Sequence, residues 1–223
     1  MPRRKCVLAN GEYYHVFNRS INKQPVLTNT RAALRAIQVI KYYLHEKPPL
    51  KFSRFIRLPK ENQSVIMDRL GMGKKLADMV AYCLMPNHFH FLLKQLTDVG
   101  IPKFVSNFQN SYAKYFNKRF EREGPLWKAR YGSVHIEDEE QLLHVSRYIH
   151  LNPYTSFVVK DIGSLFRYPF SSLPGYLNLE ESGLVNTKHI FSYFKNAKDY
   201  KKFVLDNADY QRRLDEIKHL MLE

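Results

Sequence analysis

Leu84-Met85-Pro86-Asn87-His88-Phe89-His90-Phe91-Leu92-Leu93 is the stretch of this sequence that decides the fold. Successive side chains of a β-strand point to opposite faces, so His88 and His90 share one face while Phe89 and Phe91 share the other. The phenylalanines indicate a core face. A polar pair on a buried strand is costly unless it is partnered. Because imidazole is a common metal ligand, the pair predicts half of a metal site; taken alone, a hydrogen-bonded structural pair is the simpler alternative.

The chain is strongly basic. Its 223 residues include 35 Lys and Arg against 21 Asp and Glu, giving a formal net charge of +14. This excess favours a polyanionic partner. The longest apolar run, residues 79–85, is far too short to cross a bilayer, and the two cysteines form neither a disulfide framework nor a metal-ligand spacing. We therefore expect a cytoplasmic protein that associates with nucleic acid and not with membranes.

Hydrophobic periodicity predicts strands and helices on both sides of the histidine pair. Strands are expected over residues 12–20, 76–84, 89–95 and 131–136. Helices are expected over residues 29–45, 101–122 and 137–151, with Pro153 ending the last one, and residues 51–75 are expected to be a connection with a short helix near 63–70. Whether residues 76–95 form a tight hairpin or one bent strand stays open. The order β-α-β-β-α-β-α predicts an α+β fold, a ferredoxin-like βαββαβ core with a central antiparallel sheet and a helix after the last core strand.

Two units are predicted along the chain. The first is a core domain over residues 1–178, and the second is a helical C-terminal extension over residues 179–223, with helices near 188–195 and 197–222.

A second candidate site lies near the end of the helix over residues 137–151. Tyr148 and Asn152 are four residues apart and therefore share a helical face. A tyrosine hydroxyl is a nucleophile toward phosphorus, and an asparagine carbonyl oxygen suits Mg²⁺ or Mn²⁺. Docked over the histidine pair, such a helix would place a nucleophile and a metal around one phosphate. The alternative is that Tyr148 packs in the core and Asn152 caps the helix.

Several ordered motifs resemble one family. The stretch 85–93 resembles the HUH motif (His-hydrophobe-His) of single-strand DNA transposases, and the closest branch is the REP-associated tyrosine transposases. Four further stretches fit this branch: Tyr14-His15-Val16-Phe17-Asn18-Arg19, Gly124-Pro125-Leu126-Trp127-Lys128-Ala129-Arg130-Tyr131, Tyr148-Ile149-His150-Leu151-Asn152-Pro153 and Tyr168-Pro169-Phe170-Ser171-Ser172. The resemblance spans residues 13–176, whereas residues 51–75 are longer than a minimal core requires.

The resemblance implies an activity and a set of site residues. It implies a metal-dependent single-stranded DNA endonuclease and strand transferase, acting on hairpin or palindromic DNA through a 5′-phosphotyrosine. His88, His90 and Asn152 would hold Mg²⁺ or Mn²⁺, and Tyr148 would be the nucleophile on the catalytic helix. A related HUH replication initiator or relaxase, and a single-strand-binding module without catalysis, are the alternatives. The protein would act as a monomer or a dimer.

Cations interleaved with aromatic residues over residues 114–131 predict the DNA contact, because cations hold phosphates while aromatic rings stack on unpaired bases. The predicted DNA-binding residues are Lys114, Lys118, Arg119, Arg122, Trp127, Lys128, Arg130 and Tyr131. A solvated basic helix face is the alternative. Arg3, Arg4 and Lys5 could extend this surface as an arm.

Other side chains near these motifs have open roles. Tyr112 and Tyr115 are rival nucleophiles, although an aromatic core stripe explains them more simply. His144, four residues before Tyr148, could accept its proton or add a ligand. His15 could reach the site if the first strand neighbours the histidine pair, and His150 is expected to be structural or to face DNA.

Overall fold

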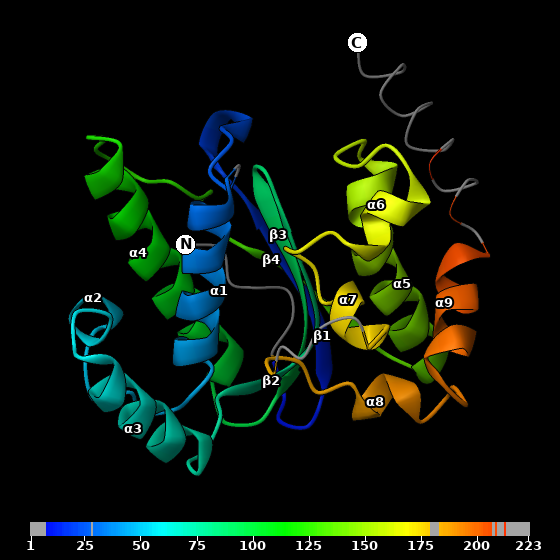
Figure 1. Ribbon diagram of the computed structural model, residues 1–223. Coiled ribbons are helices and arrows are strands. Elements are labelled where there is room, and N and C mark those ends of the chain that lie inside the picture. Colours follow the sequence, from blue (N-terminus) through cyan, green and yellow to red (C-terminus); the bar gives the residue numbers. More distant parts are fainter. Residues whose placement is uncertain (1–7, 28, 179–182, 207, 209–211, 213–223) are drawn as a thin grey trace.

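The fold is built around one antiparallel sheet. The computed structural model describes residues 8–27, 29–178, 183–206, 208 and 212. In these residues the strands are β1 (Tyr13–Arg19), β2 (Ala77–Met85), β3 (His88–Gln95) and β4 (Gly132–Ile136), in the spatial order β2-β3-β1-β4 (Figure 1). Each neighbouring pair is antiparallel. This is the strand order of a ferredoxin-like βαββαβ unit, so the predicted fold class is confirmed.

One face of the sheet is covered by helices from the first half of the chain. These are α1 (Thr30–Tyr43), α2 (Phe52–Phe55), α3 (Lys60–Gly71) and α4 (Gly100–Arg119), with a short 3-10 turn, η1 (Ile21–Lys23), after β1. Phe89 and Phe91 are fully buried here and pack on Phe108 of α4. The alternation of the histidine stretch therefore places its phenylalanines in the core, as predicted.

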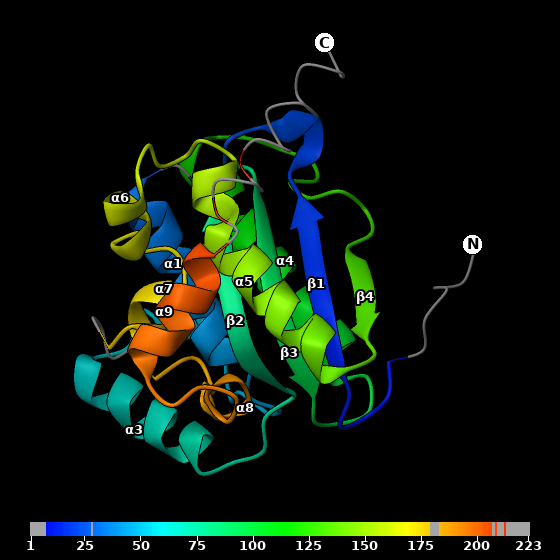
Figure 2. The ribbon, with the colours of Figure 1, turned by 90° about the vertical axis from the view of Figure 1, so that its right-hand side faces the viewer.

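The opposite face carries the later helices. α5 (Glu139–Thr155) crosses the sheet, and α6 (Ile162–Phe166), α7 (Leu173–Tyr176), α8 (Lys188–Phe191) and α9 (Ala197–Leu205) lie around it (Figure 2). Leu92 of β3 and Ile149 and Leu151 of α5 belong to the apolar core on this side. The chain thus forms two cores, one on each side of the sheet.

The structure resolves one open point of the sequence prediction, the β2–β3 connection, and differs from the prediction in other elements. β2 and β3 form a tight hairpin, because Met85 pairs with His88 across the two residues of the turn. α5 continues through Pro153, which removes only one backbone donor in the final turn. Residues 51–75 contain two helices, α2 and α3. The predicted helix 197–222 is seen as far as Leu205; the remainder, like Arg3, Arg4 and Lys5, lies outside the described residues.

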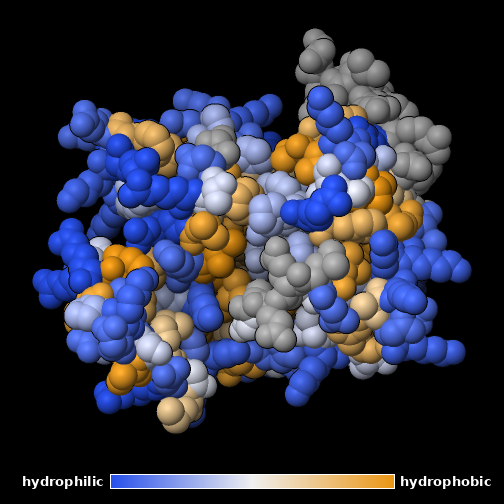
Figure 3. Space-filling view, in the orientation of Figure 1, coloured by the Kyte–Doolittle hydropathy of each residue, from blue (hydrophilic) through white to orange (hydrophobic). Residues whose placement is uncertain are grey.

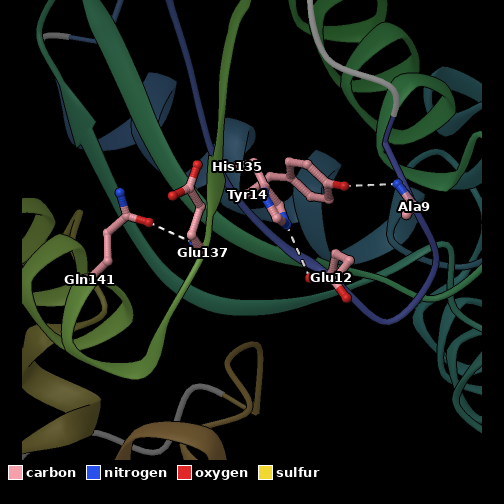
Figure 4. Close-up of polar contacts among 6 residues, drawn as sticks. All are labelled: Ala9, Glu12, Tyr14, His135, Glu137 and Gln141. Atoms are coloured by element: carbon pink, nitrogen blue, oxygen red, sulfur yellow. Dashed lines mark hydrogen bonds and ion pairs between the residues drawn. The ribbon is translucent and has the colours of Figure 1, made fainter.

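Polar contacts hold the edge strand β4 to its neighbours (Figure 4). His135 Nε2 lies 3.0 Å from Oε2 of Glu12, beside the start of β1. The Glu137 amide donates to Oε1 of Gln141 at 2.7 Å, which ties the end of β4 to the first turn of α5. Tyr14 accepts a hydrogen bond from the Ala9 amide at 2.8 Å. Strand β4 and helix α5 are therefore linked where the chain passes from one to the other.

No helix in the described part of the chain combines the length and the apolar character needed to span a bilayer.

A buried polar network joins α5 to α7 and α9. His150 is fully buried; its Nδ1 lies 2.7 Å from the Tyr200 hydroxyl and its Nε2 lies 2.7 Å from Oγ of Ser172. Arg147 Nη1 donates to the Phe203 carbonyl at 3.3 Å, and its guanidinium lies over the Phe203 ring. Helix α9 therefore packs against α5 next to Tyr148, through both hydrogen bonds and ring contacts.

We expect His150 to make stability depend on pH. Burial lowers the pKa of His150 to about 3, whereas an unfolded histidine titrates near 6.5. Between these values the unfolded chain binds the extra proton, so the contribution of His150 is complete above pH 6.5 and is lost as the pH falls toward 3, by up to about 1.4 kcal/mol per unit. Urea denaturation at several pH values should show a shallower pH dependence for His150→Gln than for the native chain; parallel curves would contradict this.

Candidate functional site

The register of β1 on β3 gathers five side chains on one face of the sheet. His88 pairs with Arg19, His90 with Phe17 and Leu92 with His15. Residues directly opposite in an antiparallel pair point to the same face, so His15, Phe17 and Arg19 join the histidine pair. This face is the one that α5 covers.

Hydrogen bonds fix the orientation of both histidines. Nδ1 of His88 lies 2.6 Å from Oδ1 of Asn87, and Asn87 in turn donates from Nδ2 to the Lys23 carbonyl at 3.2 Å. Since the Asn87 oxygen can only accept, Nδ1 of His88 carries the proton and Nε2 keeps its lone pair. Nδ1 of His90 lies 2.9 Å from Nε2 of His15, which leaves Nε2 of His90 as its other polar atom.

Helix α5 places Tyr148 and Asn152 over the histidines. Its N-terminus is capped by Asp138, whose carboxylate accepts from the Gln141 amide. The Tyr148 ring stands edge-on to His90 with 5.5 Å between ring centroids, and 39% of the residue is exposed. Asn152 is 3% exposed and hydrogen-bonds to His88. The four predicted residues of the metal and nucleophile site therefore converge, as the helical spacing of Tyr148 and Asn152 requires.

Burial keeps the histidines neutral. It lowers the pKa of His88 to about 4, with the Arg19 charge adding to the effect and the Asn152 hydrogen bond opposing it. Burial and then the neighbouring His15, His88 and Arg19 hold the pKa of His90 well below its usual value. Neutral imidazoles retain the lone pair that a metal needs. The donor set of two imidazole nitrogens and one amide oxygen thus fits a divalent cation. Among the described residues no group of three or more His, Cys, Asp or Glu could hold a metal, so the fit depends on Asn152.

A cavity of about 430 Å³ opens over these residues, and three cations line it: Arg19, Lys128 and Arg130. The segment that carries the last two is docked on the end of β1. Buried Asn18 donates from Nδ2 to the Lys128 carbonyl at 2.9 Å, and the Lys128 amide donates to the Arg19 carbonyl at 2.9 Å. A rim of cations around a tyrosine hydroxyl and a pair of neutral histidines suits a phosphodiester.

The predicted DNA-binding residues divide between places. Lys128 and Arg130 line this cavity, whereas Lys114, Lys118 and Arg119 line another cavity on the far side of the sheet. Arg122 donates to Asn117 and to the Pro125 carbonyl within its own loop.

The two predicted stacking aromatics also lie elsewhere than expected. Trp127 is 5% exposed and packs edge-on to Phe89 in the core, so in this structure its ring offers no face to an unpaired base. Tyr131 packs against the same core. Aromatic side chains in a basic stretch favour a stacking interpretation, but the docking of residues 126–130 on β1 buries Trp127, and Tyr131 is partly buried.

The rival residues are occupied elsewhere. Tyr112 is fully buried and donates to the Val26 carbonyl, and Tyr115 lies beside it on the face of the sheet opposite the histidines. His144 contacts Arg147 and Glu140. His150 is fully buried between Tyr200 and Ser172, which agrees with the first of its two predicted roles, a structural one.

Sequence reasoning missed two contributors: Arg19, which lines the cavity, and Asn87, which orients His88. His15, which was expected to reach the site if the first strand neighbours the histidine pair, contacts His90. Asn87 and Arg19 both lie inside the motifs quoted above. The position of Asn87 directly before the candidate ligand His88 was a sequence signal that it could orient the imidazole. The contact of His15 depends on strand pairing.

Gly132 is required by the close approach of Phe17. A Cβ on Gly132 would lie 2.4 Å from Cζ of Phe17, whose ring lines the cavity and lies near His90. We expect Gly132→Ala to push this ring aside and to lower the free energy of unfolding by about 1–3 kcal/mol, measured by urea denaturation. In a Phe17→Ala background the same change should cost much less, while Ser133→Ala serves as the control on β4. Equal losses in both backgrounds would contradict the clash.

Comparison with known proteins finds one family model that matches part of the chain. Residues 67–152, which carry the histidine pair and most of α5, match the family model described as "Transposase IS200 like". No curated protein sequence matches the chain.

Three solved structures are similar to this chain to different degrees. A REP-associated tyrosine transposase bound to a REP hairpin is 18% identical, with a TM-score of 0.52, over 84% of this chain and 90% of that one. A candidate transposase from Deinococcus radiodurans R1 is 17% identical over 67% of this chain and 95% of that one, with a TM-score of 0.37. The tRNA(His) guanylyltransferase of Saccharomyces cerevisiae is 11% identical over 92% and 81%, with a TM-score of 0.38. Only the first is similar enough to bear on the fold, which it confirms. Residues 67–152 are thus similar to the IS200-like transposases, and the fold is similar to that of a REP-associated tyrosine transposase.

Proposed function

We propose that the protein is a metal-dependent single-stranded DNA endonuclease and strand transferase that acts through Tyr148. The observation that carries this proposal is the convergence of Tyr148, Asn152 and the two neutral histidines in one cavity rimmed by cations. Tyr148 is 39% exposed and its ring borders the cavity beside His90, and a nucleophile for phosphorus requires such access to the substrate.

Nε2 of His88, a nitrogen of His90 and Oδ1 of Asn152 would hold Mg²⁺ or Mn²⁺. Two imidazoles in the set favour Mn²⁺ over Mg²⁺. When bound, the cation supplies Lewis-acid polarisation of a phosphate oxygen. Asn87 and His15 would orient the ligands, because their hydrogen bonds to His88 and His90 determine which imidazole nitrogen is free to bind the cation.

The protein residues then perform an in-line transfer. Arg19, Lys128 and Arg130 hold the phosphodiester against Tyr148. The Tyr148 oxygen forms a bond to phosphorus as the bond to the 3′ oxygen breaks. The phenol loses its proton to solvent in the open cavity, and the departing 3′ oxygen gains one. A 5′-phosphotyrosine and a free 3′-hydroxyl result. Attack by another 3′-hydroxyl reverses these bond changes and joins strands without an external energy source.

Hairpin DNA is the proposed substrate. The similar solved transposase is described as bound to a REP hairpin, and this chain carries a net charge of +14. A stem presents a single-stranded flank at its base, which could enter the cavity.

We expect Tyr148→Phe to abolish a covalent adduct. The measurement is denaturing gel analysis of a labelled hairpin with single-stranded flanks after incubation with Mn²⁺ or Mg²⁺. Tyr193 is the matched control, since 41% of it is exposed against 39% of Tyr148, and Tyr193→Phe should form the adduct normally. An adduct that survives in Tyr148→Phe would refute the assigned nucleophile. If none of many hairpins gives an adduct while binding persists, the module without catalysis replaces the enzyme.

We expect Asn87→Ala to weaken Mn²⁺ binding about 10- to 100-fold, because His88 loses the acceptor that fixes its tautomer. Calorimetric titration of the protein without DNA measures this independently of activity. Asn10→Ala, which removes an exposed asparagine that bonds Asp98, is the control and should bind Mn²⁺ as the native chain does. Unchanged affinity in Asn87→Ala would show that Asn87 does not orient the ligand.

A further inference from the structure

A second basic cavity lies on the face of the sheet opposite the histidines, between α1, α2 and α4. Its volume is about 820 Å³, against about 430 Å³ for the first cavity. Figure 3 shows predominantly hydrophilic residues over α2 and α4 along this side of the molecule. We propose that this cavity binds an unpaired nucleotide of the same single-stranded DNA on which Tyr148 acts, an inference that rests on the proposed function.

The charge of the cavity calls for a polyanion. Six cations line it and no acidic residue does: Arg35, Lys51, Arg57, Lys114, Lys118 and Arg119. Within the part of the chain that the structure describes, none of the six takes part in an ion pair. So many unpaired cations in one concavity repel one another and focus a positive potential there, and a phosphate backbone relieves both effects.

The floor of the cavity is aromatic. Tyr43 and Tyr115 line it and are partly exposed, whereas Phe52 lines it but is only 3% exposed. The Arg35 guanidinium lies 4.9 Å from the Tyr115 ring centroid and 5.4 Å from that of Phe52. Aromatic rings and arginine planes are the groups on which unpaired bases stack. Tyr115 also has a buried hydroxyl oxygen without a hydrogen-bond partner in the described structure. A buried hydroxyl in that state is costly, and a base edge could satisfy it.

These features select an unpaired nucleotide over a duplex or an acidic peptide. A concavity of this volume encloses a small ligand, whereas a double helix would contact only the rim and leave the aromatic floor unused. An acidic peptide would satisfy the cations but supplies no planar group for the floor.

The two cavities are joined by one stretch of the chain. Arg119 ends α4 at the second cavity, and the connection to β4 carries Lys128 and Arg130 to the first. A DNA strand following this connection meets cations along its path. The α2 segment, which closes the second cavity, lies in the part of the sequence that exceeds a minimal core.

The test uses a fluorescent hexathymidine and the full chain carrying Tyr148→Phe, so that binding is measured without cleavage. Fluorescence anisotropy should show that Lys114→Glu with Lys118→Glu weakens binding at least about 10-fold and reduces the salt slope by about 1.4, the value for two phosphate contacts on a single strand. Lys103→Glu is the matched control for one charge reversal on α4, since Lys103 does not line the cavity; it should change affinity far less than Lys118→Glu alone. Circular dichroism checks folding.

A second measurement locates the base. Irradiation of the complex with a 5-iodouracil-containing oligonucleotide should cross-link Tyr43 or Tyr115, identified by peptide mass spectrometry. Tyr115→Phe should weaken binding about 3- to 10-fold, as expected for one lost hydrogen bond. Thymidine monophosphate and a blunt duplex should bind much more weakly than the single strand. Equal effects of Lys103→Glu and Lys118→Glu, cross-links confined to the first cavity, or equal displacement by hexaglutamate would each overturn the proposal. These outcomes are separate from adduct formation by the chain with intact Tyr148, whose failure would overturn the proposed function instead.

Discussion

The antiparallel pairing of β1 with β3 is the constraint on which the site depends. It sets Arg19 opposite His88 and Phe17 opposite His90, and it brings Nε2 of His15 within 2.9 Å of Nδ1 of His90. A shift of β1 by one residue would turn His15, Phe17 and Arg19 to the other face. Such a shift is opposed by the core, because it would remove Tyr14 and Val16, which are buried there. Burial of apolar side chains on one face of the sheet therefore determines which polar side chains meet on the other face.

Polar groups in the second core are tolerated because each has a partner. His150 contacts Tyr200 and Ser172, and the Tyr200 hydroxyl also donates to Ser146. The same network joins α9 to α5, so the position of Tyr148 depends on residues beyond the predicted boundary at 178/179. Helix α9 of the predicted C-terminal extension thus helps to hold α5 in place, whereas the division of the chain into two units stays a prediction.

Charge is distributed over both faces of the sheet rather than in one patch. Lys128 and Arg130 line the first cavity, beside Tyr148. The second cavity, on the opposite face of the sheet, is lined by Arg35, Lys114, Lys118 and Arg119. Contiguous sequence suggested one DNA surface because helix α4 and the segment after it are adjacent in the chain. In space they diverge, since the chain crosses from one layer to the other before β4.

The sequence by itself determined the fold class and the residues at the centre of the site. Alternation of period two identified the histidine face, and the four-residue spacing of Tyr148 and Asn152 identified a helical face, because both depend only on local backbone geometry. Tertiary structure decided everything that arises between distant segments. The pairing of β1 with β3 brought His15 and Arg19 to the site, the docking of 126–130 on β1 buried Trp127, and the packing of α2 against α1 and α4 made a second cavity. Such contacts follow from packing and register across the sheet, which no local pattern in the chain specifies.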